Sequence, residues 1–143
     1  MEQVILAQTD TTVGFLSQSS QRLQQIKMRD SAKPFLKVYA DFKALSRDIR
    51  IPSLHKRLVR YARKTTFIVQ DQAFRYVDEP DHSRLIARYG WLYSTSANES
   101  GKSYDETFCQ SFSDLIIEDY RGLSEKSASK IYRLTSTRLK QLR

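Results

Sequence analysis

The sequence contains few of the residues that mark disulfide-bonded or metal-binding proteins. It has one cysteine, Cys109, and two histidines among 143 residues. A single cysteine cannot form an internal disulfide, and these three residues match no recognised spacing of metal ligands. We therefore expect no metal site built by the protein, and a cytoplasmic location, because reducing compartments suit an unpaired thiol.

Glycine and proline are also scarce, at four and three residues, too few for a linker or a low-complexity segment. No apolar run approaches the ~20 residues of a membrane span, and the first residues lack the basic region of a signal peptide. We expect no membrane partner. The length and the 40% hydrophobic content predict one domain over residues 1–143, with a basic tail at about 135–143.

Positive charge is abundant and concentrated in two segments. The formal net charge is +8, and residues 47–64 and 121–143 each hold seven basic residues and one acidic residue. Such segments attract polyanions, nucleic acid first and anionic membrane second. A solvated surface that binds nothing specific is an equally open interpretation.

Apolar periodicity predicts a mixed α/β fold. Two β-branched or aromatic runs, 65–69 and 73–77, flank three polar residues and predict a hairpin. Helices are expected at about 20–27, 41–48, 53–63, 81–89 and 105–112, and further strands at 4–6, 13–16, 35–39, 91–93, 115–118 and 131–134. In the helix at 53–63, the inner face would comprise Leu54, Leu58, Tyr61 and Ala62. Interleaved strands and helices with one hairpin favour a mixed sheet with flanking helices.

A polar string, Ser-Thr-Ser-Ala-Asn-Glu-Ser-Gly, occupies residues 94–101, directly after a predicted strand. Backbone N–H groups, short hydroxyls and an amide can form a neutral cradle for phosphate or carboxylate oxygens. In an arbitrary sequence this string is more often an ordinary turn. The other common phosphate loops and the nucleophile elbow of hydrolases, G-x-x-x-x-G-K-[ST], G-x-G-x-x-G and G-x-S-x-G, do not occur in the sequence.

The string at 94–101 resembles the signature loop of the YrdC/TsaC family of threonylcarbamoyl-AMP synthases. Residues 8–14, Gln-Thr-Asp-Thr-Thr-Val-Gly, resemble the family's P-T-[DE]-T-x-Y-G loop, with Gln8 in place of proline and Val13 in place of tyrosine. Further matches follow in family order: a K-x-R segment at 27–29, a V-R-x-P-D-H stretch at 74–82, and a weaker P-S-T-[IV] segment at 127–131. We identify the chain as a short-form member.

The resemblance implies a YrdC/RibB-like fold, an open, twisted sheet with a positively charged cavity. It implies an enzyme that makes threonylcarbamoyl-AMP and pyrophosphate from L-threonine, bicarbonate and ATP with Mg²⁺. Its partners would be tRNA or double-stranded RNA and the proteins that transfer the threonylcarbamoyl group to tRNA. The residues assigned to catalysis are Lys27, Arg29, Ser96 and Asn98. Those assigned to ATP and substrate binding are Thr9, Asp10, Thr11, Lys33, Arg75, Ser94 and Thr95.

Alternatives remain open at this point. In an extended segment Lys27 and Arg29 would face one cavity, but they could instead form a solvated helix end. The outer-face cations of the helix at 53–63, Lys56, Arg60 and Arg63, would form an RNA-binding surface. Because Val13 departs from the family pattern and two segments are basic, a second possible function is a nucleotide- or double-stranded-RNA-binding protein with reduced or no synthase activity. We expect Cys109 to be a packed side chain and not a nucleophile.

Overall fold

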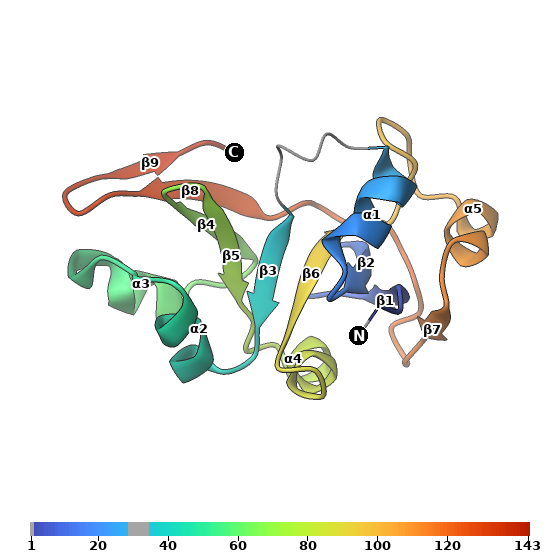
Figure 1. Cartoon of the computed structure of the whole chain (residues 1–143), viewed down its shortest axis with the longest axis horizontal. Coiled ribbons are helices and arrows are strands. Elements are labelled where there is room, and N and C mark those ends of the chain that lie inside the picture. The colour runs from blue at the N-terminus through green and yellow to red at the C-terminus, as the bar shows by residue number, and fades with distance from the viewer. Residues whose placement is uncertain (1, 29–34) are drawn as a thin grey trace. The chain divides into compact units, whose positions relative to one another are not determined.

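The computed structural model describes residues 2–28 and 35–143. The chain divides into two compact units (Figure 1): residues 1–35 with 92–127, called the first unit, and residues 36–91 with 128–143, called the second unit. Each unit has its own strands and its own hydrophobic core. One domain over residues 1–143 stays a prediction.

The first unit is built on four strands in the order β7 (Leu115–Ile117), β1 (Ile5–Gln8), β2 (Val13–Ser17) and β6 (Trp91–Ser96). β1 pairs parallel with β7 and antiparallel with β2, which pairs antiparallel with β6. β6 is longer than predicted and includes residues 94–96, because Gly14 of β2 pairs with Ser96. Backbone pairing with β2 therefore overrides the turn propensity of the hydroxyl residues.

Two helices belong to the first unit, α1 (Ser20–Lys27) and α5 (Glu106–Ser111). Of the two serines that could cap this helix, Ser19 does so, since its hydroxyl accepts a hydrogen bond from the Arg22 amide at 3.2 Å. α1 packs against β2 and buries Leu23 and Ile26. The core of this unit consists of Val4, Leu6, Val13, Phe15, Leu23, Ile26, Phe35, Ala97 and Cys109.

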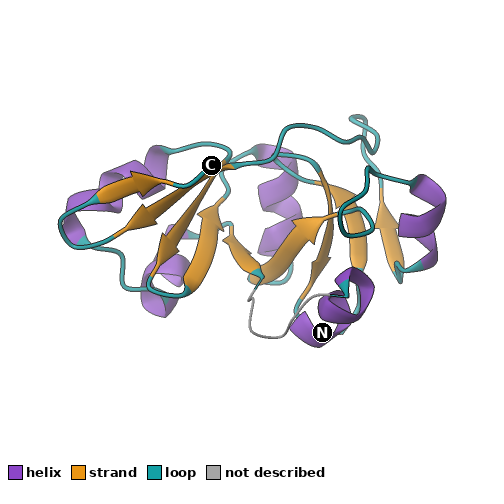
Figure 2. Ribbon diagram, turned by 90° about the horizontal axis from the view of Figure 1, so that it is seen from above, coloured by secondary structure: helices purple, strands orange, loops and turns teal. Residues whose placement is uncertain are grey.

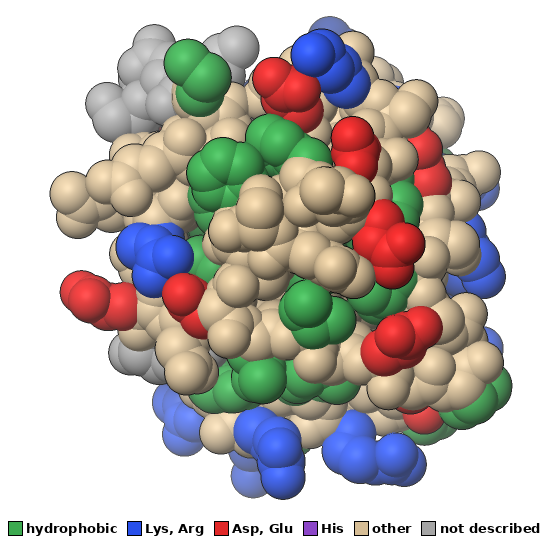
Figure 3. Space-filling view, turned by 90° about the vertical axis from the view of Figure 1, so that its right-hand side faces the viewer, with side chains coloured by type: hydrophobic (Ala, Val, Ile, Leu, Met, Phe, Trp, Pro, Cys, Tyr) green, Lys and Arg blue, Asp and Glu red, His purple; other side chains and the backbone are tan. Residues whose placement is uncertain are grey.

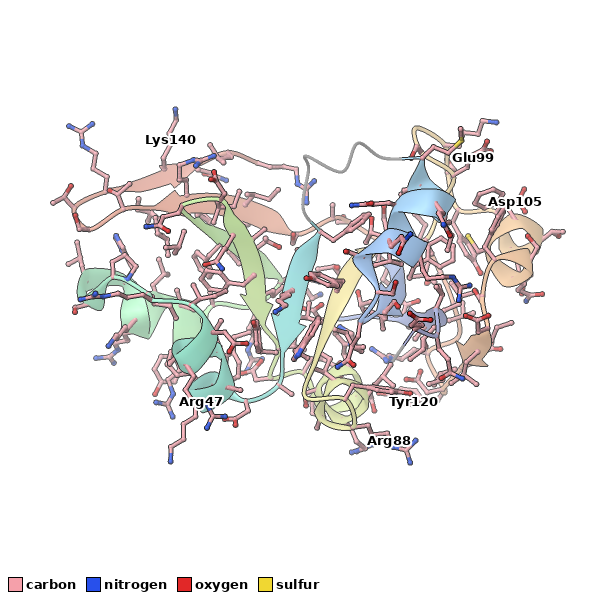
Figure 4. All side chains as sticks on the ribbon, in the orientation of Figure 1. Arg47, Arg88, Glu99, Asp105, Tyr120 and Lys140 are labelled. Carbon is pink, nitrogen blue, oxygen red and sulfur yellow. The ribbon has the colours of Figure 1, made fainter. Side chains whose placement is uncertain are left out.

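The second unit contains five strands in the order β3 (Leu36–Tyr39), β5 (Gln72–Tyr76), β4 (Thr65–Val69), β8 (Lys130–Leu134) and β9 (Leu139–Gln141). β4 and β5 form the predicted hairpin, whereas β3–β5 and β4–β8 are parallel. The basic tail continues this sheet, because β9 pairs antiparallel with β8. Lys140 of β9 points away from the ribbon (Figure 4).

Helices flank the strands of the second unit: α2 (Phe42–Asp48) and α4 (Pro80–Ala87) pack against β3, and α3 (Lys56–Tyr61) packs against β5. Its core consists of Tyr39, Leu45, Ile49, Ile51, Val59, Phe67, Val69, Phe74 and Leu134. Strands with flanking helices (Figure 2) and parallel and antiparallel pairs in both units confirm the predicted mixed α/β fold.

The predicted inner face of the helix at 53–63 is wrong. Leu54 and Tyr61 are 67% and 68% exposed, whereas His55 and Val59 are buried. The segment begins as a 3₁₀ turn, Ser53–His55, and only then becomes α3. Of the predicted face, Ala62 packs against the core, and it shares the inward side with His55 and Val59 at i, i+4 and i+7. A ring nitrogen of the buried His55, Nε2, also lies 2.9 Å from the Thr135 carbonyl oxygen. This contact keeps the His55 side of the segment turned toward the core.

Acidic residues gather in the part of the first unit that follows β6. Residues 99–125 contain seven acidic and two basic residues, whereas residues 49–70 of the second unit contain six basic and no acidic residues. Figure 3 shows Asp and Glu side chains lying among hydrophobic ones on the face that carries α5 and β7. The net positive charge is therefore unevenly shared between the units.

Asp114 joins β7 to the start of β1. One carboxylate oxygen, Oδ2, accepts hydrogen bonds from the Val4 amide at 2.8 Å and forms an ion pair with Arg22 at 3.0 Å. The Val4 hydrogen bond, with Arg22 second, holds the pKa of Asp114 below its usual value. A carboxyl with a lowered folded-state pKa stabilises the fold above its unfolded pKa, about 3.9, and loses that contribution as the pH falls.

We therefore expect Asp114→Asn to lower the free energy of unfolding at pH 7, with a difference from the parent that shrinks as the pH falls below about 4. Chemical denaturation of both proteins at pH 7, 5 and 3 measures this difference. Asp71→Asn, in the exposed turn between β4 and β5, is the control for loss of one carboxylate. If the free energies of unfolding of parent and Asp114→Asn differed equally at pH 7 and pH 3, the stabilising role of the ionised Asp114 carboxylate would be contradicted.

Candidate functional site

The loop that follows β6 is held by the buried ammonium group of Lys27. Its Nζ donates to the carbonyl oxygen of Ser96 at 2.9 Å and to the carbonyl oxygen and Oδ1 of Asn98, both at 2.8 Å. The Ser96 hydroxyl also donates to Asn98 Oδ1, at 2.7 Å. Three residues predicted to act together are thus one hydrogen-bonded network within the first unit.

Lys27 is neither extended nor a solvated helix end. It is the last residue of α1 and only 7% exposed, and Met28 ends the helix in the left-handed conformation at φ 50°. The helix C-terminus carries a partial negative charge that favours a cation there. The three acceptors described above are two backbone carbonyl oxygens and one amide oxygen, which can take all three N–H donors of an ammonium group. The network therefore places a cationic side chain among short hydroxyl and amide groups.

The loop between β1 and β2 contains Thr9, Asp10 and Thr11, all of them buried. The Thr9 hydroxyl donates to the Thr12 carbonyl oxygen at 2.6 Å and accepts from the Thr11 amide at 3.1 Å. These contacts form a tight turn in which the side chain organises the backbone. The hydroxyls of Thr9 and Thr11 lie 3.2 Å apart.

The two loops lie side by side in the first unit. The Ala97 amide donates to the Val13 carbonyl oxygen at 2.9 Å, and Gly14 pairs with Ser96. A Cβ atom on Gly14 would lie 2.9 Å from Thr9 Cγ2 and 3.1 Å from the Thr95 carbonyl oxygen. Only glycine permits this approach without a shift. The structure thus brings Thr9, Asp10, Thr11, Ser94 and Thr95 into one region with the Lys27 network.

Arg75 lies in the second unit, on β5, and is 3% exposed. Its Nη1 donates to the Thr66 hydroxyl at 3.1 Å, and that hydroxyl lies 2.8 Å from the Ser129 hydroxyl. A second guanidinium, that of Arg143, donates to the Ser129 carbonyl oxygen at 2.9 Å. Sequence reasoning noted Ser129 only in the weak 127–131 match, and it missed Thr66 and Arg143. No local pattern signals that these three residues meet.

The remaining predicted site residues fall outside this network. Arg29 and Lys33 lie outside the described residues. Lys56, Arg60 and Arg63, predicted to bind RNA, are all exposed in or next to α3. Cys109 is fully buried, and burial raises the pKa of its thiol, which is typical of the packed side chain that we predicted.

Within residues 2–28 and 35–143, three or more His, Cys, Asp or Glu side chains do not gather anywhere as a metal-binding group. Within the same residues, no helix has the length and apolar character needed to span a membrane.

Comparison with known proteins places the chain in a family. The model of the Sua5/YciO/YrdC family, described as telomere recombination, matches residues 1–143. The chain belongs to the Sua5/YciO/YrdC family. This confirms the family resemblance of the sequence motifs.

Similar proteins include one curated relative and two solved structures. An uncharacterized MG259 homolog of Mycoplasma pneumoniae is 34% identical over 94 residues, covering 64% of this chain and 20% of that protein. P. abyssi Sua5, complexed with L-threonine, is 19% identical with a TM-score of 0.80, covering 99% of this chain and 50% of that one. E. coli YciO is 19% identical with a TM-score of 0.76, covering 99% and 82%. The structures show a shared fold, and the chain spans about a fifth of the curated relative.

The Lys27 network makes a prediction that does not depend on activity. Lys27→Met keeps an unbranched side chain that is one atom shorter but removes all three donors, so the backbone at residues 96–98 should open more often. We expect amide hydrogen exchange at residues 97–100 to become about tenfold faster or more, as the loss of charge-assisted hydrogen bonds implies. Lys102→Met, in the same loop with its ammonium paired to Glu99 at 3.0 Å, is the matched control and should leave this exchange nearly unchanged. Equal acceleration in both variants would contradict the anchoring role.

Proposed function

We propose that this protein is an L-threonylcarbamoyladenylate synthase. In that reaction the amine of threonine and bicarbonate form a carbamate with release of water. A carbamate oxygen then attacks the α-phosphorus of ATP and expels pyrophosphate. The observation that carries the proposal is the hydrogen-bonded network in which Lys27 of α1 holds Ser96 and Asn98 of the family's signature loop. This network lies beside the loop at residues 9–12.

The reaction needs positive charge more than it needs a base. The carbamate and the triphosphate are both anions, so a site must offset their repulsion before the oxygen can reach phosphorus. In this proposal Lys27 supplies a fixed cation, and Thr95 supplies a hydroxyl donor for substrate oxygens. The Ser96 hydroxyl would exchange its present acceptor, Asn98 Oδ1, for a substrate oxygen. The carbamate is already nucleophilic. Catalysis would come from positioning and charge neutralisation.

The second unit offers a cluster suited to phosphate oxygens. The guanidinium groups of Arg75 and Arg143 approach the hydroxyls of Thr66 and Ser129. Arginine binds phosphate with paired N–H donors, and hydroxyls add neutral donors. Taken by itself, the second unit thus offers Arg75, Ser129 and Arg143 as candidate ligands of phosphate oxygens.

Mg²⁺ would enter as part of the substrate, MgATP. Mg²⁺ in nucleotide sites is bound largely by phosphate oxygens and water, with one or two carboxylates at most.

Threonine is the proposed acceptor because P. abyssi Sua5, which shares this fold, was solved in complex with L-threonine. The family pattern has tyrosine where this chain has Val13, and Val13 is fully packed in the first core. An aliphatic core residue cannot offer the hydroxyl or ring edge of a tyrosine. We therefore propose the same amino-acid substrate in a reshaped pocket, with tRNA and the threonylcarbamoyl-transfer proteins as downstream partners.

Release of pyrophosphate from ATP tests the proposal directly. We expect release that requires both threonine and bicarbonate, and a drop of about a hundredfold or more in Lys27→Ala, Ser96→Ala or Asn98→Ala for the lost transition-state contacts. Ser103→Ala, just past the signature loop and exposed, is the control and should retain parental turnover. Release that is independent of threonine, or absent in the folded parent, would refute the proposed activity.

RNA contact through α3 is a separate proposal that rests on exposed cations. Lys56, Arg60 and Arg63 are exposed in a stretch, residues 49–70, that has no acidic residue. Lys and Arg that contact phosphates release bound counterions, so duplex RNA binding should weaken steeply as salt rises.

Reversing these three cations to Glu should flatten the slope of log affinity against log salt by about two to three and leave pyrophosphate release unchanged. Filter binding or fluorescence anisotropy at several salt concentrations measures the slope. If the triple variant bound duplex RNA as tightly as the parent, the proposed RNA contact through α3 would be contradicted, and its cations would serve solubility only.

A further inference from the structure

The segment at residues 119–126 crosses the loop at residues 8–13 within the first unit, and we call these the strap and the substrate loop. Nothing in the proposed reaction uses the strap. Its backbone nevertheless bonds to the far end of the substrate loop, where the Val13 amide donates to the Ser124 carbonyl oxygen at 3.2 Å and the Lys126 amide donates to the Thr12 hydroxyl at 2.9 Å. Gly122 turns the strap at φ +69°, a left-handed conformation that favours glycine.

Arg121 contacts the N-terminal end of the substrate loop. Its Nη2 contacts the Gln8 carbonyl oxygen at 3.3 Å, and its Nη1 contacts the Thr9 carbonyl oxygen at 3.4 Å. Asp119 holds the same guanidinium through Nε and Nη2, with the shortest contact at 2.7 Å. The Arg121 hydrogen bond holds the pKa of Asp119 below its usual value, so the pair is ionised at neutral pH. Because Asp119 neutralises its charge, Arg121 acts on the position of the loop more than on the charge of a substrate.

Gln8, which stands where the family pattern has proline, makes a side-chain contact with the strap. Its amide is buried, at 4% exposure, and Oε1 accepts a hydrogen bond from the Ser124 amide at 2.9 Å. Within the described residues, Nε2 of the same side chain is buried without a hydrogen-bond partner. A buried, half-satisfied amide is unfavourable for stability alone. Proline, which the family pattern has at this position, could not make the Ser124 contact.

We propose that the strap holds the substrate loop in its threonine-binding conformation, with Gln8 and Arg121 as positioning residues. The inference rests on the proposed function and on the substrate-binding role that the family resemblance implies for Thr9 and Thr11. The strap fixes the loop at both ends, at Gln8 and Thr9 on one side and at Thr12 and Val13 on the other. The internal turn of Thr9 then sets the hydroxyls between them. Small displacements of such groups cost binding and rate because reacting atoms must meet in a narrow range of geometry.

The test is steady-state kinetics of pyrophosphate release with threonine and ATP varied separately. Arg121→Ala removes the two contacts with the carbonyl oxygens of Gln8 and Thr9. Gln8→Met removes the one contact with the Ser124 amide and nearly preserves the length of the side chain. We expect the KM for threonine to rise about tenfold, as loss of one or two buried polar contacts implies, while the KM for ATP changes less than about twofold. Arg121→Lys keeps a cation beside Asp119 and should recover part of the loss. Arg138→Ala, an exposed cation of the second unit, is the matched control.

An unchanged KM for threonine in both variants, with an active parent, would overturn the strap while leaving the proposed function intact. Equal increases in both KM values together with a lowered melting temperature would also overturn it, because that pattern indicates general damage. A folded parent that releases no pyrophosphate with threonine would refute the proposed function itself, and the positioning role with it. A rise in the KM for threonine alone, partly reversed by lysine, supports the inference.

Discussion

The buried ammonium of Lys27 is the contact on which the candidate site depends. It joins the end of α1 to Ser96 and Asn98, residues about seventy positions further along the chain. Buried carbonyl oxygens need donors, and a single cation with three N–H groups satisfies the loop's oxygens at one point. The loop therefore keeps one conformation although it is rich in residues that favour turns.

The same region shows how backbone packing and polar contacts act together. Gly14 lets β2 approach Thr9 and the Thr95 carbonyl oxygen, and the pairing of β2 with β6 then sets the two loops side by side. The strap approaches the substrate loop from another part of the chain, through Arg121 and Ser124. Three segments that are distant in sequence thus define one small region of the first unit.

The departures from the family pattern have different consequences. Val13 is absorbed into the hydrophobic core, where an aliphatic side chain packs without a polar partner. Gln8 instead acquires a new contact with the strap, at the cost of an amide group that is only partly satisfied. Val13 therefore removes a polar group from the loop, whereas Gln8 adds a hydrogen bond between the loop and the strap.

The sequence alone determined the order of the helices and of strands β1 to β8 and the β4–β5 hairpin, because these depend on local propensity and on residue order. The family motifs singled out Lys27, Ser96 and Asn98. The sequence could not determine the inner face of the segment at 53–62, since the contact of the buried His55 ring with distant Thr135 sets which side packs inward. It also could not find the cluster of Arg75, Thr66, Ser129 and Arg143, or the strap. Those contacts join residues far apart in the chain, and only strand pairing and close packing in the tertiary structure bring them within hydrogen-bond distance.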